Sequence, residues 1–126
     1  MDGHAKESDD PASAQAVEAL LKKAVTIDPK LGQAHLQLGI LYSERNDYAQ
    51  AIGAYQKAIE VTPQLSEAHY RLGVAYQRTG DQAKAQQEFL THQQVEKTEA
   101  ASVERQRREV QQFLIVLKEQ PPTPQK

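Results

Sequence analysis

The sequence repeats itself at an interval of 34 residues, and this period constrains the fold more than any other feature. Residues 32–65 align with residues 66–99 without a gap, and part of a third copy precedes them between residues 23 and 31. A unit of this length cannot enclose a core alone, so the copies must stack and bury their faces against neighbours. The identical pairs are Ala34/Ala68, His35/His69, Leu38/Leu72, Gly39/Gly73, Tyr42/Tyr76, Asp47/Asp81, Ala49/Ala83, Ala51/Ala85 and Val61/Val95.

Within each copy the apolar residues follow a helical spacing. Leu38 and Tyr42 lie four residues apart on one face of a predicted first helix. Asn46-Asp47, like Gly80-Asp81 in the next copy, predicts a left-handed turn followed by the cap of a second helix. Pro63 then stops the second helix. Each copy is predicted to be a helix, a tight turn and a second helix, so the fold class is all-α.

This pattern resembles the tetratricopeptide repeat, in which a large residue, Leu-Gly and Tyr are followed by Ala, an aromatic residue, Ala and Pro. The resemblance implies a short right-handed superhelical solenoid of antiparallel helix pairs. Small residues let the two helices of a repeat cross closely, and Gly39 is expected to face Ala51 there. His92 and Lys97 depart from the pattern in the second copy. The matching residues are His35, Leu38, Gly39, Tyr42, Ala51, Tyr55, Ala58 and Pro63, then His69, Leu72, Gly73, Tyr76, Ala85 and Phe89.

The ends of the chain are predicted to differ from the repeats. Residues 10–31 read as the second helix of a partial repeat whose first helix is missing. This suggests either a fragment of a longer array or another element that covers the exposed helix face. Ser102–Lys118 is amphipathic and is expected to cap the last repeat, after a helix break near Thr98–Ser102. The predicted segments are a disordered tail over 1–9, the partial repeat over 10–31, full repeats over 32–65 and 66–97, a C-terminal capping helix over 98–119, and a disordered Pro-rich tail over 120–126.

Composition excludes several classes of protein. There is no Cys, which rules out disulfides, thiolate metal sites and a thiol nucleophile. The net charge of −2 argues against nucleic acid and membrane surfaces as partners. The longest apolar run, Phe113–Leu117, is too short to span a bilayer, and the N-terminus lacks the apolar stretch of a signal peptide. The chain is therefore expected to be soluble, and its compartment is not indicated.

No motif for catalysis is present. The sequence lacks a phosphate-binding glycine-rich loop, a nucleophile elbow and a His-Glu-x-x-His motif. His35 and His69 occupy equivalent positions one repeat apart, about 10 Å by helix-packing distance, which is too far for shared metal ligation. They are interpreted as packing residues. We expect no enzyme activity, no cofactor and no metal site.

The resemblance implies that a peptide binds the concave face formed by the first helices. Chaperone-binding members of the family clamp a terminal carboxylate with Lys, Asn and Arg, but this chain has apolar or aromatic residues at those positions. An apolar or amphipathic protein segment is the expected partner. The candidate contacts are Gln33, Leu36, Ile40, Ser43 and Glu44 in the first copy and Glu67, Tyr70, Val74, Gln77 and Arg78 in the second.

The predicted function is that of a non-catalytic scaffold or adaptor that holds a peptide or helix of a partner protein. In so short an array, the apolar residues of the concave face could instead be covered by another element. A neighbouring helix, the chain's own C-terminal helix or a second copy could cover it. The alternative function is therefore a structural end piece that forms homodimers or larger homo-oligomers through its exposed apolar helix faces.

Overall fold

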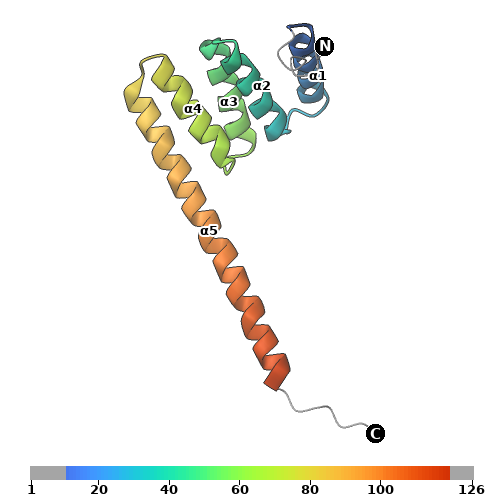
Figure 1. Ribbon diagram of the computed structural model, residues 1–126, viewed down its shortest axis with the longest axis vertical. Helices are drawn as coiled ribbons and strands as arrows, with labels where there is room; N and C mark the ends of the chain where they lie inside the picture. Colours follow the sequence, from blue (N-terminus) through green and yellow to red (C-terminus); the bar gives the residue numbers. More distant parts are fainter. Residues whose placement is uncertain (1–10, 120–126) are drawn as a thin grey trace, which may run out of the picture. The chain divides into compact units, whose positions relative to one another are not determined.

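The computed structural model describes residues 11–119, which form five α-helices and no strand (Figure 1). The predicted tails over 1–9 and 120–126 lie outside these residues. The all-α fold class is confirmed, since neighbouring helices pack in adjacent pairs as a solenoid. The helices are α1 (Pro11–Ile27), α2 (Gly32–Glu44), α3 (Tyr48–Val61), α4 (Ser66–Arg78) and α5 (Gln82–Glu119).

The turns inside the two full repeats have the predicted geometry. Asn46 adopts a φ of 61° between α2 and α3, and Gly80 adopts a φ of 87° between α4 and α5. The following aspartates then begin the second helices. The Asp47 carboxylate accepts a hydrogen bond from the Gln50 backbone N–H at 3.3 Å, and Asp81 accepts one from Lys84 at 3.4 Å. The left-handed turn and the side-chain cap therefore recur one repeat apart.

The close crossing inside each repeat brings glycine against an aromatic ring. A Cβ added at Gly39 would overlap the ring of Tyr55, and one at Gly73 would lie 2.6 Å from Cε1 of Phe89. The ring of Tyr55 is therefore the nearest neighbour of a Cβ at Gly39, and the expected pairing of Gly39 with Ala51 stays a prediction. The fully buried Ala51 leaves room for the helix backbones, while the ring one turn further along the helix lies against the glycine.

The core of the first unit, residues 1–95, is a continuous cluster along α2, α3, α4 and the start of α5. It consists mainly of alanine, leucine and tyrosine, because short side chains at the helix crossings alternate with rings that fill the wider gaps. The buried members are Leu36, Leu38, Tyr42, Ala51, Tyr55, Ala58, Ala68, Leu72, Ala75, Tyr76 and Ala85.

The last helix differs from the sequence-based prediction. α5 runs without interruption from Gln82 to Glu119, so the predicted break near Thr98–Ser102 is wrong. Its residues include no glycine or proline to stop it. The second unit, residues 96–126, contains its C-terminal part, where Val110, Phe113 and Leu117 are each about half exposed. That this segment caps the last repeat stays a prediction.

Candidate protein-binding groove

A groove of about 310 Å³ lies in the first unit, where α2 and α4 pass over the start and middle of α3. We call it the repeat groove. Its walls come from the two first helices, as the solenoid geometry requires, and its floor comes from the second helix between them. The lining residues are Ile40, Ser43 and Glu44 from α2, Tyr48 and Tyr55 from α3, and Tyr70, Arg71, Val74, Ala75 and Arg78 from α4.

Six of the ten predicted contact residues line the repeat groove, namely Ile40, Ser43, Glu44, Tyr70, Val74 and Arg78. Gln33, Glu67 and Gln77 are exposed but do not line it. Leu36 is a correction. Its side chain is 0% exposed and belongs to the core cluster, so it is not available to a ligand. Whether the six residues contact a partner stays a prediction.

Three lining residues were missed from the sequence. Tyr48 and Tyr55 come from the second helix, which the family pattern does not assign to the ligand face. Arg71 lies beside Val74 and Ala75 in the lining, and with Arg78 these positions follow the i, i+3, i+4, i+7 spacing of one helix face. That spacing was readable in the sequence and could have identified Arg71.

The floor of the repeat groove consists of tyrosine rings, and the Tyr55 hydroxyl at its end is held by a hydrogen bond. Tyr55 is 1% exposed, and its phenolic oxygen lies 3.0 Å from the Ser43 hydroxyl. Burial raises the pKa of Tyr55, so the phenol stays neutral at physiological pH. Half-buried Ile40 and Val74 face the groove from opposite walls. An apolar side chain that enters here meets carbon on both sides and one hydroxyl pair at the floor.

The rim of the repeat groove bears charge of both signs. Arg71 donates a hydrogen bond to Glu67 at 2.9 Å and is neutralised by it. Glu44 and Arg78 are exposed and have no side-chain partner among residues 11–119. One unpaired anion and one unpaired cation therefore flank the apolar floor.

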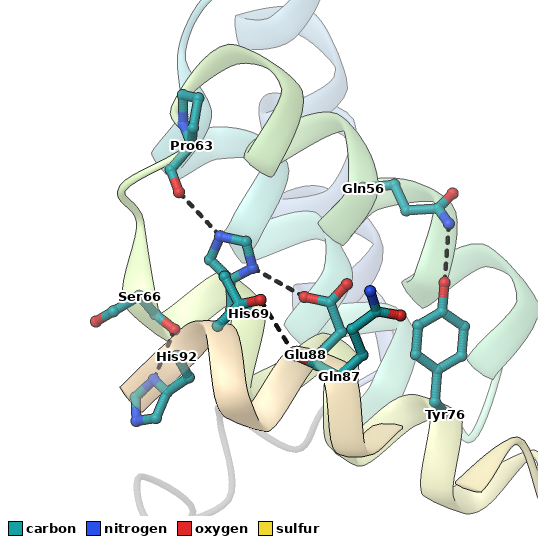
Figure 2. A network of polar contacts seen from close by, with 9 residues as sticks. Gln56, Pro63, Ser66, His69, Tyr76, Gln87, Glu88 and His92 are labelled. Carbon is teal, nitrogen blue, oxygen red and sulfur yellow. Dashed lines mark hydrogen bonds and ion pairs between the residues drawn. The ribbon is translucent and has the colours of Figure 1, made fainter. Parts of the chain in front are cut away.

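Tyr70 is held in place by a small aromatic cluster at the α4 edge of the repeat groove. Its ring centroid lies 5.6 Å from that of Phe89 and 5.4 Å from that of His92. His92 is anchored in turn, since its Nδ1 lies 3.0 Å from the Ser66 carbonyl oxygen (Figure 2). His92, which departs from the repeat pattern, thus contacts one side of the Tyr70 ring and helps to hold it, while Tyr70 itself stays 49% exposed.

The two equivalent histidines have the predicted packing role. His69 is buried, with Nε2 at 2.9 Å from the Pro63 carbonyl oxygen and Nδ1 at 2.8 Å from a carboxylate oxygen of Glu88 (Figure 2). His35 is also buried, and its Nε2 lies 3.1 Å from the Pro29 carbonyl oxygen. Between residues 11 and 119, no group of three or more metal-ligating side chains is placed to hold an ion.

Two family models match this region of the chain. A tetratricopeptide repeat model matches residues 20–53, and a second repeat model of the same kind matches residues 41–80, which hold most of the repeat groove. Residues 20–80 therefore consist of tetratricopeptide repeats. None of the curated proteins matches the sequence of this chain.

Solved structures with the same fold include crystal structures of MamA. One is 27% identical with a TM-score of 0.70, and its match covers 79% of this chain and 57% of that chain. A second structure of MamA protein is also 27% identical, with a TM-score of 0.66 and coverage of 79% and 53%. This chain therefore spans little more than half the length of these relatives. None of its helices over residues 11–119 is both long and apolar enough to cross a membrane.

Proposed function

We propose that this tetratricopeptide repeat chain is a non-catalytic scaffold that holds a peptide or helix of a partner protein in the repeat groove. The observation that carries the proposal is the lining of the groove. Apolar side chains from two first helices converge over one second helix, and at the rim stands a charge of each sign that has no side-chain partner among residues 11–119. The volume of about 310 Å³ suits a few side chains of a peptide rather than a large cofactor.

The chemistry of the groove favours an amphipathic partner segment. Ile40 and Val74 offer apolar contact to an inserted aliphatic or aromatic side chain, and Tyr70 covers it from the edge. Arg78 and Glu44 are free to pair with flanking charges of opposite sign on the partner. The lack of a cation cluster at the fifth and ninth positions of each repeat argues against a terminal carboxylate as the main anchor.

The test begins with affinity capture of partners and mass spectrometry, followed by titration of the captured partner against variants. Val74→Glu places a charge in the apolar wall, and Tyr70→Ala removes the edge ring, so both should weaken binding at least about tenfold. Leu90→Glu is the matched control, because Leu90 is 57% exposed and lies outside the groove lining. Equal binding by all three variants and the unmodified chain would place the partner elsewhere.

A second candidate function is homo-oligomerisation through the second unit. Phe113, Leu114, Ile115, Val116 and Leu117 form a continuous apolar run, each 49–61% exposed. An exposed patch of this kind often marks an interaction site. Light scattering over a wide concentration range tests the idea. A strict monomer at high concentration rejects it, while a dimer that dissociates on Leu114→Glu supports it.

A further inference from the structure

In the partial repeat, α1 exposes a helix face whose equivalent on α3 is buried in the next repeat. A shift of 34 residues superimposes Val17 and Leu21 of α1 on Ala51 and Tyr55 of α3. The two α3 residues are 0% and 1% exposed, because α2 packs over them. Val17 in contrast is 47% exposed, and Leu21 is only half-buried. The same face of a second helix is thus covered in one repeat and open in the other.

The open face is part of a groove of about 260 Å³ between α1 and α2, which we call the entry groove. Ala14, Val17 and Leu21 line it from α1, at i, i+3 and i+7 on one helix face. Ile40 and Leu41 line it from α2. Two helices that present apolar stripes to a shared groove are the geometry in which a third helix is bound.

The next repeat shows which element packs against the equivalent helix face. Shifted by 34 residues, the entry-groove residues Ile40, Leu41 and Leu21 become Val74, Ala75 and Tyr55, which all line the repeat groove. In the repeat groove, α2 packs on α3 and supplies the second wall. The entry groove is therefore the same structure one repeat earlier, except that none of the helices over residues 11–119 supplies that wall.

We infer that the entry groove docks a helix of a partner protein with the chemistry of a first repeat helix. That helix would be amphipathic and would place glycine or alanine where it crosses Leu21. The inference goes beyond the proposed function, because it concerns a second groove, which shares only Ile40 and Glu44 with the repeat groove. The docked helix would pack on α1 as α2 packs on α3. The packing of Gly39 against the Tyr55 ring is the direct precedent for this chemistry.

A second copy of the chain is the less suitable occupant. Its α2 and α4, the helices with the required glycines, are already packed into their own repeats. Its α1 presents the bulky Val17 and Leu21 on its open face. Its residues 96–119 contain no glycine, and the small residues Ala100, Ala101 and Ser102 precede the apolar run instead of alternating with it. A helix so bulky along its apolar face cannot approach α1 as closely as α2 approaches α3.

The chain itself provides the probe for a test. A labelled peptide with the sequence of α2 (Gly32–Glu44), acetylated and amidated, is titrated against the full chain and followed by fluorescence anisotropy. Because an isolated helix of this length is mostly unfolded in water, the titration extends to about 1 mM peptide. We expect saturable binding that Val17→Glu weakens at least about tenfold. A peptide with Gly39→Leu should bind at least about tenfold more weakly, because its side chain would meet Leu21.

Two control variants of the full chain locate the peptide. Leu20→Glu lies on α1 beside Val17, is 67% exposed in the unmodified chain and does not line the entry groove, so it should leave binding unchanged. Val74→Glu alters only the repeat groove and should also leave binding unchanged. Circular dichroism confirms that each variant retains its helix content. If Val74→Glu weakens binding as Val17→Glu does, the peptide occupies the repeat groove, which overturns this inference and leaves the proposed function standing.

Three further outcomes overturn the inference. One is the absence of saturable binding up to the highest peptide concentration. Another is equal loss of binding in Val17→Glu and Leu20→Glu, which would indicate a general charge effect along α1. The last is a dimer of the chain that dissociates on Val17→Glu but persists in Leu20→Glu, because a second copy would then be the occupant.

Discussion

The crossing of α2 and α3 at Gly39 predicts opposite effects for two glycine substitutions. Gly39 and Gly53 both lie inside helices of the first full repeat. A Cβ at Gly39 would overlap the buried ring of Tyr55, whereas a Cβ at Gly53 would meet nothing within 4 Å. The ring cannot swing aside freely, since its hydroxyl lies 3.0 Å from that of Ser43 and its side chain is 1% exposed. A larger side chain should therefore destabilise the fold at Gly39 but not at Gly53.

The magnitudes follow from two opposing terms. Leucine is about 0.8 kcal/mol better than glycine inside a helix, and this gain applies at both positions. At Gly39 a leucine also overpacks a filled crossing, which costs about 3 kcal/mol, at the upper end of the usual range because the overlap begins at Cβ. We expect Gly39→Leu to lose about 2 kcal/mol of unfolding free energy and Gly53→Leu to gain up to about 0.8 kcal/mol.

Urea denaturation followed by circular dichroism measures both values, and thermal melts should shift by roughly 4 °C per kcal/mol for a chain of this size. A double-mutant cycle with Tyr55→Ala identifies the cause. The cavity left by the ring should accept the new leucine, which gives a favourable coupling of about 1 kcal/mol or more between the two substitutions. The reasoning is refuted if Gly39→Leu is as stable as the unmodified chain, or if the coupling is zero.

Three other predictions concern the polar and core contacts of the first unit. Hydrogen bonds from Arg45 and Lys22 lower the pKa of Glu18 to about 2. The stability from this carboxylate should be fully present above pH 4.5 and lost as the pH falls toward 2, and Glu18→Gln should flatten that part of a stability-against-pH curve. Leu36→Ala should cost about 2–5 kcal/mol in denaturant titrations, because the side chain is in the core, while partner affinity of the folded variant stays unchanged. His69→Leu should destabilise by about 1–3 kcal/mol and by more than His35→Leu in paired melts, since His69 contacts both a carbonyl and a carboxylate.

The helices and turns were predictable because their determinants are local. Leu38 and Tyr42 recur at helical spacing, and Asn46 and Gly80 are the residue types that accept a positive φ. The continuous α5 was also indicated by the absence of glycine and proline. The predicted break near Thr98–Ser102 had neither residue type to cause it, and α5 is continuous there.

The composition of the repeat groove was only partly predictable, because its lining depends on how three helices pack. The family pattern correctly places Ile40 and Val74 on the groove, since those positions face inward in any solenoid of this kind. It fails at Leu36, which α2 turns into the core, and at Tyr48 and Tyr55, which enter from the second helix. Such residues are identified only once the depth and tilt of the helix crossings are known.

The hydrogen bonds of His35 and His69 have a consequence for how such a chain grows. Each histidine begins a repeat and bonds the carbonyl of the proline that ended the one before, Pro29 and Pro63 respectively. Each full repeat therefore has one half of this contact near its start, and the proline three residues before its first helix supplies the other half. If residues 32–65 were duplicated at the boundary between residues 65 and 66, Pro63 of one copy would lie six residues before His35 of the next. The histidine–proline contact would then form again, so an added repeat would bring this contact with it.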